Sequence, residues 1–177
     1  MKRVICCLLL FFFTAALRQV FASYVLPYPS YMPGNKLYRL SRIVDRLKLS
    51  WSWGSIAQTK AYMSLSDKYL VEAKTLFAYK QYLLGADALK RSNTAYEQVP
   101  IYIQRGRSER KDMSSVVTQV RESVVVHTEF LSQMEKEVPR EFVWTPEKTS
   151  ATSLPLSEYI KGAIKIRQSV LEAIEPI

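Results

Sequence analysis

The chain has 177 residues, 48% of them hydrophobic, with 25 lysines and arginines, 16 aspartates and glutamates and a single histidine, for a net charge of +9. This length fits one ordinary domain with a real hydrophobic core. One histidine, two cysteines and the absence of Gly-x-Ser-x-Gly, phosphate-loop, His-Glu-x-x-His and Gly-x-Gly-x-x-Gly motifs argue against the common nucleophilic, zinc and nucleotide-dependent enzymes. We therefore expect no catalytic site, no metal ion and no cofactor.

Residues 1–22 have the layout of a secretory signal peptide. Lys2 and Arg3 precede an apolar run over residues 4–17, and Val20 and Ala22 place small residues before a cleavage site after Ala22. The run has 14 residues and is shorter than the roughly 20 that a membrane span needs. The chain is therefore expected to be exported.

An uncleaved anchor over residues 4–26, with Arg18 inside it, stays open as an alternative, so the protein would be extracellular or held at the outer face of the cytoplasmic membrane. Cleavage would leave 177 − 22 = 155 residues without cysteine and a net charge of 22 − 16 = +6. Outside the cytoplasm, such a positive balance fits anionic lipid, acidic envelope polymers or simple solubility.

Residues 23–34 form a spacer rich in proline and tyrosine. Pro27, Pro29 and Pro33 fix φ and lack a backbone donor, so this segment is expected to be extended and unable to join a helix. A single helical domain is expected over residues 35–177.

Residues 36–53 are predicted to form a basic amphipathic helix with Asn35 at its cap. Its apolar residues recur at spacings of 3, 4, 3 and 4, which gives one stripe that a bundle helix would turn toward its core. The alternative is that the helix lies in an anionic lipid interface. The stripe is Leu37, Leu40, Val44, Leu47 and Trp51, and the candidate lipid or polyanion contacts are Lys36, Arg39, Arg42, Arg46, Lys48, Trp51 and Trp53.

A second helix is expected to begin near Ser55 and to stop or turn at Gly85, and a third to begin near Ala86. Pro100 should kink or break this third helix. Residues 101–111 then either continue as a helix or form a basic connector.

The most regular pattern is an apolar seam spaced 4, 3, 4, 3, 4, 3 and 4, which predicts one long helix that ends before Pro139. A partner helix must cover such a stripe, from this chain, a second copy or a foreign protein. The seam consists of Met113, Val117, Val120, Val124, His127, Leu131, Met134 and Val138.

Residues 139–155 are expected to be a loop, with a short turn at residues 145–147, before a last helix over residues 156–174. The apolar stripe of that helix is expected at Leu156, Ile160, Ala163, Ile164, Val170, Leu171 and Ile174. The fold class is therefore predicted as all-α, an antiparallel bundle of four or five helices behind the signal peptide or anchor.

Residues 33–97 resemble an uncharacterised family of exported bacterial helical proteins, a domain of unknown function. That family joins a signal peptide to a Pro-Gly-x-x-x-Tyr-x-Leu start and an Arg-Leu-x-Glu-Ala-like segment. The resemblance implies export and helices but no activity. It is carried by Pro33, Gly34, Tyr38, Leu40, Leu65, Leu70, Glu72 and Ala73, and the chain departs from the pattern at Ser41, Lys68 and Tyr69.

Two further site hypotheses have weak signals. His127 with Glu122 and Glu129 could hold a metal, but the Glu-x-x-His spacing of di-metal bundles is missing. A basic cluster beside Tyr102 could contact phosphate, although export makes nucleic acid an improbable partner. That cluster is Arg105, Arg107, Arg110 and Lys111.

The sequence thus predicts an exported, non-catalytic helical module of the bacterial cell envelope with an interaction or structural role. Its partner would be an unknown protein or an envelope polymer, and self-association is open. The alternative is a peripheral membrane protein that binds anionic lipid through residues 36–53.

Overall fold

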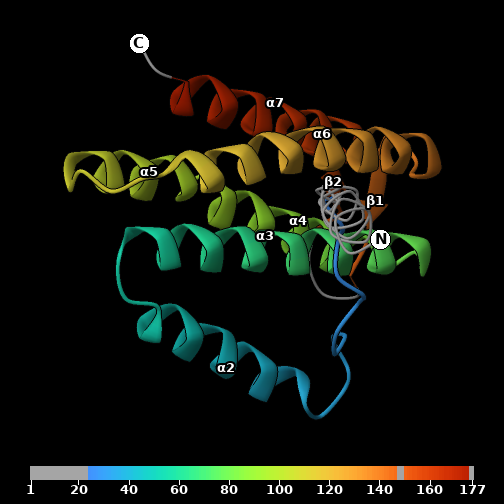
Figure 1. Ribbon diagram of the computed structural model, residues 1–177. Coiled ribbons are helices and arrows are strands. Elements are labelled where there is room, and N and C mark those ends of the chain that lie inside the picture. Colours follow the sequence, from blue (N-terminus) through green and yellow to red (C-terminus); the bar gives the residue numbers. More distant parts are fainter. Residues whose placement is uncertain (1–23, 147–149, 176–177) are drawn as a thin grey trace, which may run out of the picture.

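The computed structural model describes residues 24–146 and 150–175, and this part of the chain is mostly helical (Figure 1). Within it, a two-stranded sheet is the only β-structure. The all-α class is therefore confirmed for these residues. The elements are α2 (Tyr38–Trp51), α3 (Ser55–Ala78), α4 (Tyr82–Tyr96), α5 (Val99–Ser108), α6 (Ser114–Glu137), β1 (Phe142–Trp144), β2 (Thr152–Leu154) and α7 (Leu156–Ile174).

Helix α3 lies at the centre of the structure. It packs along α4 and α5 and contacts α6, while α6 lies beside α7, which also contacts α4 and α5. Two buried apolar clusters fill the interior, one containing Leu70 and Leu131 and the other Met63 and Val120. Helix α2 lies at the edge against α3, apart from these layers (Figure 1).

The chain breaks just before Pro100. Helix α4 ends at Tyr96 and α5 begins at Val99, which places Pro100 in the first turn of α5. Proline is tolerated there because its missing N–H would have no partner within the helix. The sequence predicted either a kink or a break at this position, and the structure shows a break. Residues 101–108 belong to a separate helix.

Gly85 is not the turn that the sequence suggested. Helix α3 ends at Ala78, and the turn to α4 passes through Lys80, whose φ is 59°. Gly85 is buried inside α4, where a Cβ atom would lie 2.4 Å from the ring of Phe77. The glycine therefore permits close packing of α4 on α3, and a sequence pattern does not distinguish that role from a helix stop.

Replacing Gly85 by alanine should lower the free energy of unfolding by about 1–3 kcal/mol, because the added methyl group overlaps Phe77. Gly162 in α7 is the matched control, since a Cβ atom there meets nothing within 4 Å. Gly162→Ala should stabilise the protein by about 0.5–1 kcal/mol, the ordinary gain in a helix. Urea unfolding of both variants checks this pair, and equal shifts would contradict the packing role of Gly85.

The segment between α6 and α7 contains a hairpin that the sequence did not reveal. Strands β1 and β2 are antiparallel, with Phe142 opposite Leu154. The ring of Phe142 lies 4.8 Å from that of Tyr82, and Leu154 is buried in the core. Strands of three residues are too short for an alternating pattern, so contacts with the bundle hold them. The turn expected at residues 145–147 lies partly outside the described residues.

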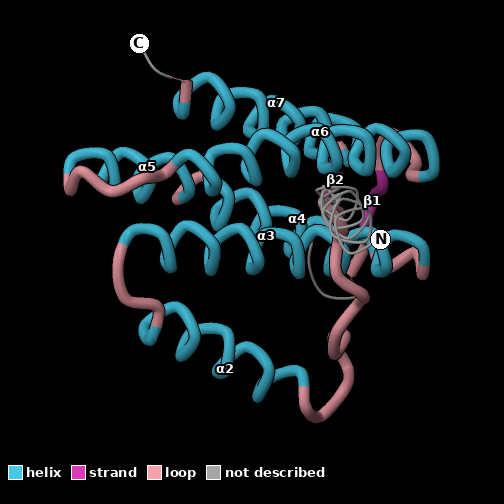
Figure 2. The backbone as a smooth tube through the Cα atoms, in the orientation of Figure 1, coloured by secondary structure: helices cyan, strands magenta, loops and turns pink. Residues whose placement is uncertain are grey.

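Residues 24–34 of the spacer contain no helix or strand (Figure 2), and the start of this segment is fixed on the bundle. The Tyr24 hydroxyl donates to Asp67 at 2.6 Å, and Leu26 and Met32 pack against the core. Tyr28 is 96% exposed. The predicted signal peptide or anchor falls almost wholly on residues 1–23, which lie outside the described residues.

Candidate functional site

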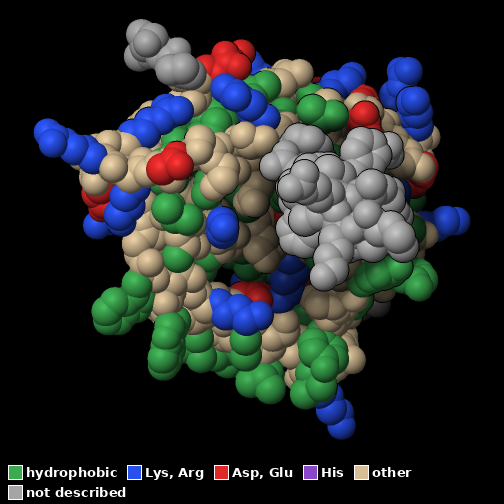
Figure 3. Space-filling model, in the orientation of Figure 1, with side chains coloured by type: hydrophobic (Ala, Val, Ile, Leu, Met, Phe, Trp, Pro, Cys, Tyr) green, Lys and Arg blue, Asp and Glu red, His purple; other side chains and the backbone are tan. Residues whose placement is uncertain are grey.

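The apolar side of α2 points away from the bundle. Leu40 is 55% exposed, Leu47 57% and Trp51 83%, and Asp45 is the residue of α2 that is buried. The expectation that this stripe faces the core is therefore wrong. Figure 3 shows hydrophobic side chains gathered along the edge formed by α2. We call this surface the α2 face, and it consists of Leu37, Leu40, Ile43, Val44, Leu47, Trp51 and Trp53.

The concentration of exposed apolar groups at this edge is unusual. Of the 18 large hydrophobic residues that are exposed in the described part of the chain, seven lie between residues 37 and 53. Single exposed hydrophobic residues are ordinary on protein surfaces, whereas a contiguous apolar patch usually marks an interaction site. The α2 face is therefore the first candidate for function.

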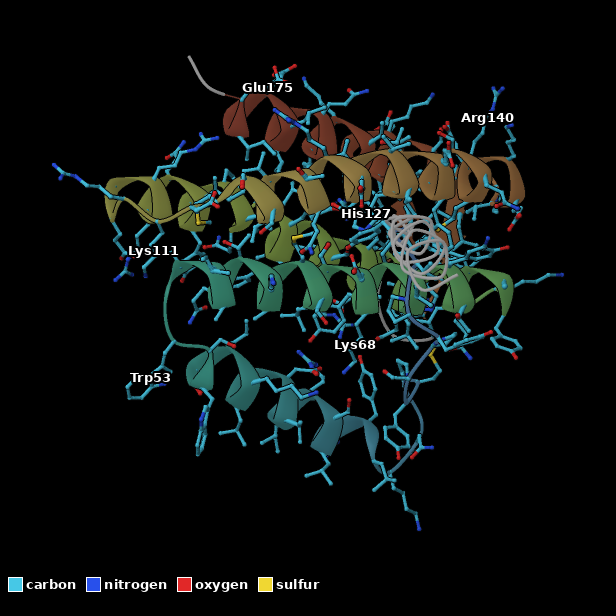
Figure 4. The ribbon with its side chains drawn as sticks, viewed as in Figure 1. Trp53, Lys68, Lys111, His127, Arg140 and Glu175 are labelled. Carbon is cyan, nitrogen blue, oxygen red and sulfur yellow. The ribbon has the colours of Figure 1, made fainter. Side chains whose placement is uncertain are left out.

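The orientation of α2 is set by polar contacts with α3. Ser41 and Asp45 lie on one side of α2, four residues apart, and the ammonium group of Lys68 contacts both of them, at 2.7 Å for the Ser41 hydroxyl. Lys68 points from α3 toward α2 in Figure 4. Because the polar side finds these partners on α3, the apolar side is left to the outside.

A second contact fixes the beginning of α2. The Tyr38 hydroxyl donates to Glu72 at 2.7 Å, and Arg91 donates to both groups, at 2.7 Å to the hydroxyl and 3.2 Å to the carboxylate. Glu72 is 1% exposed, and Arg91 also pairs with Asp87 at 3.1 Å. Burial raises the pKa of Tyr38, so the phenol stays protonated and remains a donor. The buried carboxylate of Glu72 therefore has two partners, Arg91 and, from α2, Tyr38.

The end of α2 is held by the side-chain amide of Gln58, which donates to the carbonyl of Leu49 at 3.0 Å. The chain then turns at Gly54, whose φ of 89° suits glycine. Trp53 lies in this connection, is 85% exposed and points away from the structure (Figure 4). Both tryptophans of the region are therefore free to meet a surface next to α2.

Basic side chains border the α2 face. Lys36, Arg39, Arg46 and Lys48 are exposed, and none of them pairs with a carboxylate within the described residues. Arg42 is half-buried beside α3. The only acidic residue of α2 is Asp45, and Lys68 neutralises it. The edge of the molecule thus combines an apolar surface with unpaired positive charge.

A cleft lies on each side of α2 where the helix leans on α3. Figure 3 shows one hollow between α2 and α3 on the visible face. The first cleft, the lysine cleft, has a volume of about 680 Å³ and is lined by Lys48, Lys60 and Lys68 and by spacer residues 27, 28 and 30. The second, the arginine cleft, has a volume of about 470 Å³ and is also lined by α4. Its charged lining residues are Arg42, Arg46, Asp87, Lys90 and Arg91.

The seam residues from Met113 to Met134 are all buried, and Val138 is half-buried. The chain's own helices cover them, because α6 packs on α3 and α7. The seam therefore offers no free stripe to a second copy or a foreign helix in this arrangement. The candidate contact surface of the molecule is α2 instead.

His127 belongs to a buried polar network. Its Nε2 atom lies 2.8 Å from Asp67, whose other oxygen accepts from Tyr24. The described residues contain no group of three or more possible metal-ligating side chains, and Glu129 on the same helix is exposed. Burial, the largest cause, lowers the pKa of His127 despite the opposing effect of Asp67. We infer a neutral imidazole at neutral pH.

A neutral buried histidine makes stability depend on pH. The unfolded chain takes up a proton near pH 6.5 and the folded chain does so at lower pH, so the stability is complete above about pH 6.5 and falls as the pH drops. The loss should be up to about 1.4 kcal/mol per pH unit below that point. His127 is the sole histidine, so His127→Gln should remove most of this loss. Urea unfolding between about pH 7.5 and pH 5 tests it, and identical profiles would refute it.

The basic cluster after Tyr102 is partly neutralised within the chain. Glu109 pairs with Lys111 at 2.7 Å and with Arg105 at 3.0 Å, while Arg107 donates to the carbonyl of Ile174. Hydrogen bonds from Lys111, then from Ser55 and Arg105, lower the pKa of Glu109 to about 2. These contacts leave less free positive charge for phosphate than the sequence suggested.

The sequence missed the buried polar residues that organise the interior. Arg167 is fully buried in α7, where it donates to Ser92 at 2.7 Å, contacts Asn93 and lies over the ring of Tyr96 at 5.1 Å. A signal was present, because the buried positions of α7 recur at spacings of 4, 3, 4, 3 and 4 and Arg167 occupies one of them. An arginine inside an apolar repeat indicates a buried hydrogen-bonding centre.

The chain matches no protein-family model, and neither curated proteins nor solved structures show significant similarity to it. The resemblance of residues 33–97 to an exported helical family therefore stays a prediction. In the part of the chain that the structure describes, no helix is both long enough and apolar enough to cross a bilayer.

Proposed function

We propose that the protein is an exported, non-catalytic peripheral membrane protein that binds anionic lipid through the α2 face. The observation that carries this proposal is the outward orientation of a strongly amphipathic helix, whose Leu40, Leu47 and Trp51 are more than half exposed. A helix that turns its apolar side outward needs a nonpolar partner surface, and a lipid interface is one.

The charge around the face favours lipid over an apolar protein partner. Arg39, Arg46 and Lys48 flank the apolar arc and lack carboxylate partners among the described residues. Near an anionic membrane surface each lysine or arginine contributes about 1 kcal/mol. Trp51 and Trp53 suit the level of the headgroups, where amphipathic aromatic rings are enriched.

The remaining parts of the chain fit this role as supports. Residues 1–22 would direct export, and if they are retained they would tether the bundle beside the membrane that α2 contacts. The other helices would form an antiparallel bundle of four or five members that holds α2 in place. Its buried contacts with α3, at Tyr38 and Asp45, keep the face presented outward.

Vesicle flotation tests the proposal. The protein is recovered after expression of the full chain, its N-terminal residue is determined, and it is mixed with vesicles of phosphatidylglycerol or of phosphatidylcholine. We expect binding to the anionic vesicles that weakens with salt, because exposed charges are screened, and weaker binding to the zwitterionic ones. Absence of binding to anionic vesicles would refute the proposal, and a dimer in light scattering would then assign the α2 face to a second copy.

A further inference from the structure

The arginine cleft beside α2 has the composition of a phosphate site. Arg42 and Arg46 reach it from α2, and Lys90 reaches it from α4. None of these three pairs with a carboxylate within residues 24–146 and 150–175. Arg91 and Asp87 also line the cleft and pair at 3.1 Å, and Arg91 pairs in addition with the buried Glu72 at 3.2 Å. Three cations that form no salt bridge within the described residues therefore line one cleft.

The walls of the cleft suit a small polar ligand. Its volume of about 470 Å³ lies within the range of about 300–1,000 Å³ typical of ligand sites. Tyr69 lines the cleft as a buried residue with Arg91 over its ring at 4.9 Å, and Thr94 and Gln98 add hydrogen-bonding groups to the lining. Guanidinium groups bind phosphate oxygens in pairs, so two arginines and a lysine match a dianionic phosphate.

The lysine cleft on the other side of α2 is a weaker candidate. It has the larger volume, but Lys68 already pairs with Asp45 inside it, and spacer residues 27, 28 and 30 form part of its wall. It also lacks an arginine. The comparison favours the arginine cleft as the anion site.

The position of the arginine cleft indicates where the phosphate comes from. Ile43 and Leu47 directly follow Arg42 and Arg46, so they lie about 100° farther round the helix, at about 3.6 residues per turn. Both are exposed parts of the α2 face. A phosphate held in the cleft therefore lies next to the surface that would meet acyl chains.

We propose that the arginine cleft binds the phosphomonoester headgroup of an anionic lipid. This inference rests on the proposed membrane function and adds headgroup selectivity to it. A phosphomonoester carries close to two charges and three terminal oxygens, whereas the phosphodiester of phosphatidylglycerol carries one charge. The three free cations of the cleft therefore discriminate between the two groups, while the α2 face binds either membrane.

The test compares vesicles that contain phosphatidic acid with phosphatidylglycerol vesicles matched in surface potential. We expect the wild-type protein to bind the phosphatidic acid vesicles about tenfold more tightly, because one additional charge-assisted contact changes the affinity by about that factor. Lys90→Gln should abolish that preference, so that the ratio of the two affinities falls to about one, while the lost charge weakens binding to both vesicle types by the same small factor, because Lys90 lies on α4 outside the α2 face. Lys90→Arg should keep the preference. Lys136→Gln, at an exposed lysine of α6, is the matched control and should change neither affinity.

Soluble glycerol 3-phosphate separates the possible sources of the ligand. Under the proposal it competes with phosphatidic acid vesicles for the wild-type protein and not for Lys90→Gln. Equal affinity of the wild-type protein for both vesicle types would overturn the site and leave the membrane function standing. Binding of glycerol 3-phosphate through Lys90 without any vesicle binding would overturn the lipid assignment and the proposed function together, and would assign the cleft to a soluble phosphate ester.

Discussion

Replacing Leu40 and Leu47 together by serine should reduce the affinity of the protein for anionic vesicles by about thirtyfold or more. Both side chains are more than half exposed in the structure, so a lipid interface can still bury most of their surface. Losing about 1 kcal/mol or more from each leucine corresponds to this change in affinity. The free energy of unfolding should stay within about 0.5 kcal/mol of the wild-type value, because neither side chain belongs to the core.

The matched control is the double variant Ile101→Ser and Val125→Ser. These residues are 53% and 57% exposed, but they lie on α5 and α6. It removes a similar exposed apolar surface and should leave vesicle binding intact. If both double variants bind equally well, the α2 face is not the surface that meets lipid.

Replacing Arg167 by alanine should lower the free energy of unfolding by about 3–5 kcal/mol, the largest stability effect expected from a single change. The substitution leaves a cavity and removes the buried partner of Ser92 and Asn93. Burial lowers the pKa of Arg167 to about 10, so the guanidinium is still charged at neutral pH and serves as a donor. Urea unfolding gives the measurement.

Two further variants separate the causes of that loss. Arg167→Met refills the cavity without the hydrogen bonds and should lose less stability than Arg167→Ala. Lys161→Ala changes a 67% exposed side chain of the same helix and should stay within about 0.5 kcal/mol of the wild-type value. A loss below about 1 kcal/mol for Arg167→Ala would show that the buried network does not organise the interior.

The long helices could be predicted from the sequence because their apolar period is sustained. The seam from Met113 to Val138 corresponds to α6, and the stripe from Leu156 to Ile174 has the bounds of α7. Pro100 marked the start of a new helix because it removes a donor and clashes with the preceding turn. In these elements, the local preference for a helix and the burial of its apolar side chains favour the same structure, so the sequence pattern is enough to predict it.

The orientation of α2 could not be predicted from its own residues. An amphipathic pattern shows that a helix has two sides, but the side that faces the bundle depends on the partners available elsewhere. Lys68 and Glu72, some twenty or thirty residues away, supply those partners to Asp45 and Tyr38. Long-range pairs of this kind, and the pair of Tyr24 with Asp67, leave no periodic signal in the chain.

The hairpin β1–β2 and the role of Gly85 were missed for similar reasons. Strands of three residues are shorter than any pattern that could predict them, and Phe142 is held by its contact with Tyr82 from another element. Gly85 is required by the ring of Phe77 on the neighbouring helix. Each feature depends on a neighbour that is distant in the sequence or belongs to another element.

Quenching of tryptophan fluorescence by lipids brominated on their acyl chains tests most directly whether the α2 face meets the membrane. The protein has three tryptophans, and Trp144→Phe leaves Trp51 and Trp53 beside α2 as reporters. We expect anionic brominated vesicles to quench and blue-shift this emission, and Leu40→Ser with Leu47→Ser to weaken both effects. Binding of the protein to vesicles without any quenching of Trp51 and Trp53 would contradict the assignment and place the contact elsewhere on the chain.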